Sequence, residues 1–317
     1  MVTSEVNAMR KLTAVLIASL CVLFAFTSCG GKKQAAIAPA DTIDYSKLVT
    51  HGPKKRIAIA DFTNKTQYAK GRIGTQASDQ LATHLVKSNA FIVIEREQLN
   101  RIMGEQALGQ TGAVKGETAA KVGELLGAQA LITGSISEFG FTQGTTDGGL
   151  FKKKSQKVRA VVNIRAIDTS TGAILFAENG EGIAETEDTQ VFGFGSKSGY
   201  DETLNDKALN QAIVKLVSNI VKNLDKVQWS GRVVKVTDSG KLIINAGQET
   251  GLQMGDTFTV SKLGEMLTDP ETGMALGREP GEVRGKVKIS SLEEKMAICD
   301  VVEGQGFEAG DQIKMTD

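Results

Sequence analysis

The stretch that decides the fold is VRAVVNIRAIDTSTGAILFA, residues 158–177. Its first nine residues place an apolar side chain at every second position, which is the pattern of a strand with one buried face. Residues 168–172 combine an aspartate and hydroxyl side chains with a glycine, and this composition predicts a turn. Residues 174–177 are mostly apolar and predict the returning strand. The sheet therefore contains an antiparallel pair of strands.

N-terminal to this pair, short apolar strands alternate with amphipathic helices. Ile73, Ala77, Leu81 and Leu85, for example, recur at every fourth position, as on the buried face of a helix. The predicted strands are residues 56–62, 91–94 and 131–139, and the predicted helices are residues 73–85, 95–107 and 117–126. Such alternation favours a sheet with helices packed on it.

C-terminal to the pair, an apolar ridge from Leu204 to Leu224 predicts a long helix over residues 201–226. After Gln228 the pattern changes to short strands separated by glycine-rich turns, which favours a small all-β barrel with SH3-like dimensions. Residues 251–260 and 306–315 repeat one motif, Gly-x-x-x-Gly-Asp followed by a strand. The predicted fold class is α/β, a mixed sheet flanked by helices with two extended hairpin segments, plus this barrel.

The composition argues against several functional classes. The 317 residues include 37 basic and 37 acidic side chains, so the chain lacks the basic excess typical of nucleic-acid binders. Two histidines, His51 and His84, leave little material for a histidine metal site or for histidine catalysis. The glycine-rich residues 193–198 lack the glycine that a phosphate-binding loop needs directly before Lys197. We therefore expect no enzymatic activity, no metal, no cofactor and no nucleic-acid partner.

The N-terminal segment has the pattern of an export signal. Arg10 and Lys11 precede an uncharged apolar run over residues 12–28, and small residues stand directly before Cys29. This junction resembles a bacterial lipobox, so residues 1–28 are the expected signal peptide and Cys29 the expected acylation (palmitate) site. An uncleaved membrane anchor is the alternative, and the sequence leaves open whether translation starts at Met1 or Met9. Gly30, where aspartate would favour the inner membrane, predicts the periplasmic face of the outer membrane.

Four motifs behind this cysteine carry a family resemblance. They are residues 57–64 (IAIADFTN), 95–99 (EREQL), 128–135 (AQALITGS) and 162–175 (VNIRAIDTSTGAIL). In this order they resemble the curli production assembly/transport family (CsgG/HfaB-like), whose members are outer-membrane lipoproteins. The resemblance implies a homo-oligomeric ring with periplasmic accessory proteins. Two hairpins per subunit would join into a barrel that exports unfolded fibre or surface-protein subunits.

The predicted domains follow from these patterns. Residues 1–28 form the signal peptide, 29–54 a tether, 55–227 the family-like periplasmic domain and 228–317 the small barrel. The hairpin candidates are residues 138–160 and 180–206. The candidate membrane-facing residues are Phe139, Phe141, Phe192 and Phe194, and the candidate pore-lining residues are Glu181, Glu185 and Glu187.

The lysines of the first hairpin candidate argue against a position of this segment in lipid. Lys152, Lys153 and Lys154 put charge on both faces of a strand, and each lipid-facing lysine costs about 2–4 kcal/mol at the bilayer midplane. Two functions therefore stay open. The predicted function is that of a secretion-channel subunit, and the alternative is a pore-less periplasmic lipoprotein that acts as a cell-envelope assembly factor or activator.

Overall fold

The structure is a computed structural model that describes residues 43–68, 72–105, 119, 122, 123, 125–147, 151–191, 200–271 and 275–316. All of these residues belong to one compact unit, Pro39–Asp317. None of the helices within the described ranges combines the length and the hydropathy of a membrane span. Two short 3₁₀ helices, η1 (Tyr45–Lys47) and η2 (Gln248–Thr250), accompany the elements named below.

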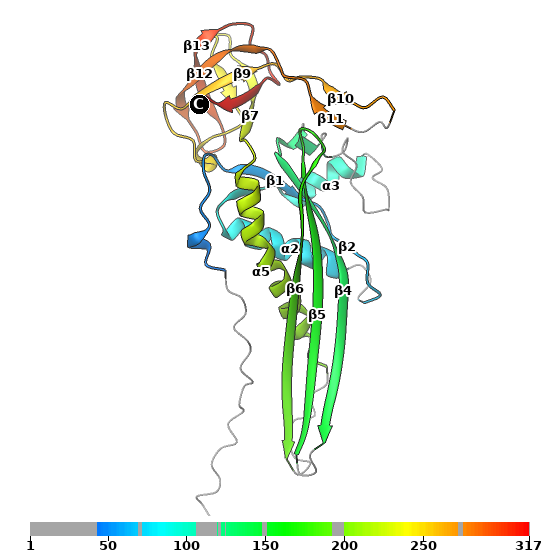
Figure 1. The fold of residues 1–317 in the computed structure, drawn as a ribbon. Coiled ribbons are helices and arrows are strands. Elements are labelled where there is room, and N and C mark those ends of the chain that lie inside the picture. The colour runs from blue at the N-terminus through cyan, green and yellow to red at the C-terminus, as the bar shows by residue number, and fades with distance from the viewer. Residues whose placement is uncertain are drawn as a thin grey trace, which may run out of the picture. The chain divides into compact units, whose positions relative to one another are not determined.

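A mixed sheet forms the centre of the N-terminal part, with strand order β3–β1–β4–β5–β6 (Figure 1). β1 (Lys55–Ile59) pairs in parallel with β3 (Phe91–Val93) and with β4 (Ala130–Asp147), and β2 (Thr63–Asn64) adds in parallel to β4. β5 (Phe151–Asp168) and β6 (Ile174–Val191) continue the sheet as antiparallel strands. β4, β5 and β6 are each 18 residues long.

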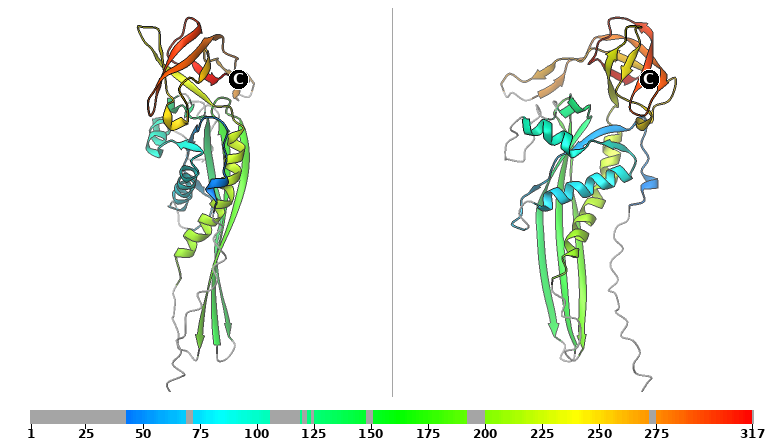
Figure 2. Two further views of the ribbon diagram at one scale, coloured as in Figure 1. Left: turned by 90° about the vertical axis from the view of Figure 1, so that its left-hand side faces the viewer. Right: turned by 180° about the vertical axis from the view of Figure 1, so that it is seen from behind.

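Helices cover both faces of this sheet because the strands around β1 alternate between two apolar clusters. Ile57 and Ile59 pack with α2 (Arg72–Lys87) and α5 (Thr203–Asp225) on one face, where both helices lie side by side (Figure 2). Ala58 and Ala60 pack on the other face, with Leu99 of α3 (Arg96–Glu105) and helical residues of the 119–126 segment. The predicted sheet with packed helices is confirmed.

Residues 158–177 fold as their sequence pattern predicts. Val158, Ala160, Val162, Ile164 and Ala166 of β5 are all at most 1% exposed, on the face covered by the helices. The turn at residues 168–172 connects β5 to β6, and the Asp168 side chain accepts hydrogen bonds from the Ser170 backbone and hydroxyl. The predicted antiparallel pair is therefore confirmed.

The two predicted hairpin segments have different outcomes. Residues 138–160 fall on β4 and β5, which pair in antiparallel register up to Asp147 and Lys152. The prediction that residues 180–206 form a hairpin is wrong for residues 203–206, because these residues begin α5. The physical reason is helical burial, since Leu204 and Ala208 lie one turn apart against Ala160 and Ala184. Residues 192–199 lie outside the described residues.

Six C-terminal strands close into a barrel in the order β12–β13–β8–β7–β14–β9. They are β7 (Ser230–Val236), β8 (Leu242–Ile244), β9 (Thr257–Ser261), β12 (Val283–Leu292), β13 (Ala297–Gly304) and β14 (Gln312–Met315). Phe258, Leu242 and Ile313 fill the interior. A small closed barrel is thus confirmed, whereas the SH3-like label stays a prediction. One further hairpin, β10 (Met266–Thr268) with β11 (Ala275–Arg278), was not predicted from the sequence.

The internal repeat builds two neighbouring strands of this barrel in the same way. Gly255 and Gly310 both adopt left-handed backbone, with φ of 93° and 97°. The following aspartates each accept a backbone hydrogen bond at 2.8 Å from the residue three positions earlier. β9 and β14, which follow these turns, then pair with each other.

Candidate functional site: the sheet extension

The residues singled out from the sequence lie on the distal halves of β4, β5 and β6. We call residues 138–147, 151–161 and 181–191 of these strands the sheet extension. α5 covers its first residues on one face, and beyond them it continues as three paired strands (Figure 1). A one-residue shift in register between Ile136 and Glu138 marks its start on β4. Because of this bulge, Phe139 and Phe141 lie on the same face as their partners Ala160 and Val158.

On that face, α5 lies directly against β6. Gly180 and Gly182 are buried, and a Cβ atom at either position would clash with the backbone carbonyl oxygen of Ala212 or Ala208. Ala184, the next residue on this face, is also buried and packs near Leu204. Small side chains on both elements therefore permit a close approach that larger ones would prevent.

Four aromatic side chains gather where the sheet extension leaves the helices. The Tyr68 ring lies 4.7 Å from the Phe139 ring, and the Phe141 ring contacts the Tyr200 ring edge-on at 4.5 Å, measured between centroids. Asn205 of α5 donates a hydrogen bond to the Tyr68 hydroxyl at 3.0 Å and accepts one from the Tyr200 hydroxyl. Burial, the hydrogen bond with Tyr68 and the neighbouring charges raise the pKa of Tyr200.

This aromatic cluster contains two of the candidate membrane-facing residues. Phe139 is half-buried and packs against both the main core and the Val158 cluster, while Phe141 is 39% exposed. Phe192 and Phe194 lie outside the described residues. A membrane-facing role of these four residues stays a prediction.

The opposite face of the sheet extension, which we call the open face, carries paired charges. Arg159 of β5 forms ion pairs with Glu138 of β4 and with Glu181 of β6, the latter at 2.6 Å. Lys153 and Glu187 form a further pair at 2.7 Å. The hydrogen bond from Arg159 lowers the pKa of Glu181 below its ordinary value.

All three candidate pore-lining glutamates lie on this open face. Glu185 is the cross-strand partner of Lys157, so each glutamate has a cation on β5 beside it or diagonally opposite. Because side chains alternate between the two faces of β6, the three glutamates lie together on one face. They also lie beside cations of β5, which was not predicted from the sequence. Their role in lining a pore stays a prediction.

A band of six residues on each strand of the sheet extension contains no apolar side chain. Residues 142–147 (TQGTTD), 152–157 (KKKSQK) and 185–190 (ETEDTQ) lie opposite one another in register. Six residues of strand span about 20 Å. A transmembrane barrel instead needs an outward apolar band about 25 Å tall.

Side chains from α5 occupy part of the outer edge of β6. Gln211 accepts a hydrogen bond from the Ile183 backbone N–H at 3.0 Å, and the Lys215 ammonium donates one to the Glu181 carbonyl at 2.8 Å. Sequence reasoning missed both residues, since nothing in a helical pattern shows which side chains reach a neighbouring strand.

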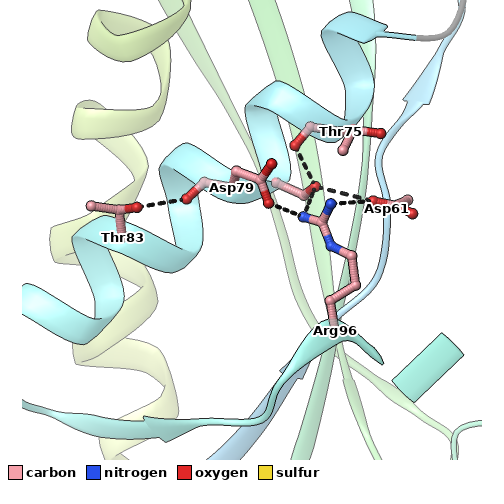
Figure 3. A network of polar contacts seen from close by, with 6 residues as sticks. Asp61, Thr75, Asp79, Thr83 and Arg96 are labelled. Atoms are coloured by element: carbon pink, nitrogen blue, oxygen red, sulfur yellow. Dashed lines mark hydrogen bonds and ion pairs between the residues drawn. The ribbon is translucent and has the colours of Figure 1, made fainter. Parts of the chain in front are cut away.

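A second polar network joins three elements at the C-terminal end of β1 (Figure 3). The Arg96 guanidinium at the start of α3 pairs with Asp61 at 3.0 Å and with Asp79 of α2, and it donates to the Ser78 hydroxyl at 2.8 Å. Thr75 and Thr83 complete the network through hydrogen bonds along α2. This network connects α2, α3 and the segment after β1.

Reactive groups are scarce in the part of the chain that the structure describes. No group of three or more His, Cys, Asp or Glu side chains in that part could hold a metal ion. Cys299 is fully buried in the barrel, and burial together with Asp300 raises the pKa of its thiol to about 12. His84 is hydrogen-bonded to Tyr45 and to Asn210. Cys29 lies outside the described residues.

Comparisons with known proteins agree with the resemblance seen in the motifs. The family model "Curli production assembly/transport component CsgG" matches residues 40–250, which extends past the predicted family-like domain (residues 55–227) into β7 and β8. A protein of Neisseria meningitidis serogroup B, described as "Putative lipoprotein NMB1126/NMB1164", is 32% identical over 228 residues, covering 68% of this chain and 96% of its own.

Among solved structures, lipoprotein GNA1162 from Neisseria meningitidis is similar at 17% identity and a TM-score of 0.33, covering 52% of this chain and 99% of its own. The LpoB C-terminal domain from Salmonella enterica is similar at 15% identity and a TM-score of 0.31, covering 41% of this chain and 84% of its own. The family match and the meningococcal relative together confirm the predicted resemblance: the chain belongs to the CsgG family of curli production assembly/transport components.

Proposed function

We propose that the chain is a lipid-anchored assembly factor of the cell envelope, held at the periplasmic face of the outer membrane by acylated Cys29. Membership of the CsgG family supports a role in assembly or transport of extracellular fibre or surface proteins. The lipobox-like junction before Cys29 and the lipoprotein description of the meningococcal relative support the anchor. In this proposal the sheet extension works in water, and its strands do not cross the bilayer.

The observation that carries this choice is the polar band across the distal sheet extension. Residues 142–147, 152–157 and 185–190 offer no apolar side chain to lipid on either face. Lys153 lies on the open face and Lys154, the next residue, on the other, so one lysine would meet lipid whichever face turned outward. Each such lysine would cost about 2–4 kcal/mol at the midplane.

A secretion channel is the second candidate, and strand length favours it. β4, β5 and β6 have 18 residues each, whereas a membrane strand needs about 9–11. In that case Glu181, Glu185 and Glu187 would face a water-filled lumen, and Phe139 would have to leave Tyr68 to reach lipid. The polar band makes this candidate the weaker one.

Both candidate functions include association of several copies of the chain. β6 is the last strand of the sheet, and past Ile183 its outer edge pairs with no other strand among the described residues. An unpaired edge of this length can add a strand from a second copy. We infer that copies of the chain associate there, and that secreted subunits and periplasmic accessory proteins bind the assembled form.

Two measurements on the purified mature protein test the proposal. Its mass in detergent should correspond to an oligomer, and its addition to planar lipid bilayers should produce no conductance. Stepwise conductance whose ion selectivity changes in the Glu185→Gln and Glu187→Gln variants would establish the channel instead. A monomeric mass without conductance would retain the assembly factor but remove the proposed oligomer.

A further inference from the structure

We infer that a hollow on the open face, between the helices and the sheet extension, binds an acidic sugar, meaning a pyranose ring that carries a carboxylate. The hollow has a volume of about 410 Å³ and is formed by β2, β4, β5 and β6. We call it the root hollow. Its size falls within the range of about 300–1,000 Å³ typical of small-molecule sites.

Neutral polar side chains form the floor of the root hollow. Thr63, Ser135, Asn163 and Asn179 follow one another in register across the four strands, and Thr133 lies two residues before Ser135 on the same face. Because paired strands fix the spacing between these side chains, their hydroxyl and amide groups are held at defined positions for a ligand.

These side chains have hydrogen-bonding capacity to spare. Within the described residues, no hydrogen bond is formed by the side chains of Thr63, Thr133, Ser135, Asn163 and Asn179. Hydroxyl and amide groups both donate and accept, as do the hydroxyls of a sugar ring. The charged side chains farther along the open face, by contrast, are already engaged with one another.

Two cations line the root hollow and supply the preference for a negative charge. Lys65, directly after β2, and Arg165 of β5 form no ion pair within the part of the chain that the structure describes. The neighbouring carboxylate, Glu178, lies on the other face of the sheet, where the side-chain amides of Asn219 and Asn223 of α5 hold it at 2.8 and 3.2 Å. The charged groups that face the hollow are therefore both positive, and the planar Arg165 guanidinium suits a carboxylate.

The combination of charge and hydroxyl chemistry distinguishes an acidic sugar from simpler ligands. A neutral sugar would leave Lys65 and Arg165 unused, and a free phosphate ion would leave the polar row and most of the volume unused. Both are therefore matched controls for the proposal.

Isothermal titration of the full-length mature protein in detergent tests the inference with three probes: digalacturonic acid, maltose and inorganic phosphate. We expect digalacturonic acid to bind at least about tenfold more tightly than either control. Arg165→Gln and Lys65→Gln should each weaken this binding about tenfold, since a charge-assisted hydrogen bond is lost. Lys157→Gln, on the same strand and face outside the hollow, should bind as the unchanged protein does. Circular dichroism verifies that each variant is folded.

Three outcomes would overturn the inference. Equal binding of maltose would show that the cations contribute nothing, and equal binding of phosphate would reduce the hollow to a simple anion site. Undiminished binding by both the Arg165 and the Lys65 variants would place the ligand elsewhere. None of these outcomes depends on whether the protein forms a pore, so the proposed function is tested separately.

Discussion

At the scale of single residues, the missing side chain of Gly182 is what allows α5 to lie against β6. A Cβ atom there would meet the Ala208 carbonyl oxygen, which belongs to the helix backbone and cannot rotate away. We expect Gly182→Ala to lower the free energy of unfolding by about 1–3 kcal/mol, the usual cost of overpacking. Urea unfolding followed by far-UV circular dichroism measures this change.

Gly140 of β4 is the matched control for that experiment. A Cβ atom at Gly140 would have no neighbour within 4 Å, so Gly140→Ala should leave stability unchanged or raise it slightly. Equal stability of the Gly182 and Gly140 variants would contradict the close approach of α5 to β6.

The carboxylate of Asp225, at the end of α5, makes the free energy of unfolding depend on pH. Burial alone would raise its pKa, but the hydrogen bonds from His51 and the charge of Lys55 outweigh burial and hold the pKa below its ordinary value. A lowered pKa in the folded state stabilises the fold above the unfolded-state pKa of about 4, and this stabilisation is lost as pH falls through the folded-state pKa.

We therefore expect Asp225→Asn to be less stable than the unchanged protein at pH 7, by about 1 kcal/mol. The difference should shrink steadily as the pH is lowered below about 4. Denaturant unfolding across this pH range measures it, with Asp238→Asn, an exposed turn residue, as the control. A difference that stays constant down to pH 2 would show that Asp225 is not the titrating group.

Residue patterns predicted local chemistry better than contacts between elements. The repeated Gly-x-x-x-Gly-Asp turns were visible in the sequence because local backbone demands select glycine and aspartate. The need for Gly182 was not visible, because it arises from a helix that begins 21 residues later. The row of polar side chains in the root hollow was also not predicted, because its members come from four strands that are far apart in the sequence.

At the scale of elements, Arg96 fixes the start of α3 to α2 and to the segment after β1. We expect Arg96→Met to weaken this attachment by about 1 kcal/mol, because the guanidinium is only 25% exposed but its partners are more open to water. Amide hydrogen exchange in α3 should then be about fivefold faster.

Arg101→Met on the same helix serves as the control, because Arg101 is exposed and forms no ion pair within the described ranges. Unchanged exchange in the Arg96 variant, or equal acceleration in both variants, would contradict the role of the network in holding α3.

The ends of a strand were predictable where apolar and polar residues alternate along the sequence. The apolar positions of β5 predicted its buried face, and the small all-β barrel expected after Gln228 is present as six closed strands. The bulge at the start of the sheet extension was not predictable, because a single extra residue reverses the faces without changing composition. Residues 203–206 fell within both the hairpin candidate 180–206 and the predicted helix 201–226, and the helix prediction is the one that α5 confirms.

At the scale of the whole molecule, attachment to the membrane should depend on one side chain. We expect Cys29→Ala to lack acyl chains by mass spectrometry and to leave the membrane fraction, since each buried CH₂ group contributes about 0.8 kcal/mol to anchoring. Cys21→Ala, within the predicted signal peptide, should be processed and anchored normally. Unchanged mass and partitioning of the Cys29 variant would rule out the anchor.

The central claim is that the sheet extension is surrounded by water, and cysteine labelling tests it directly. Single cysteines replace Thr142, Gln143, Thr145 and Thr146 of β4, all exposed and alternating between the two faces. Each variant is reconstituted into lipid vesicles and treated with a charged maleimide on both sides of the bilayer. Cys299 adds little background, because its thiol is buried and its pKa is raised to about 12.

The account predicts that all four positions react, at similar rates with and without vesicles. An alternating result, in which Thr142 and Thr146 react while Gln143 and Thr145 become protected in vesicles, would contradict it and show that these strands face lipid.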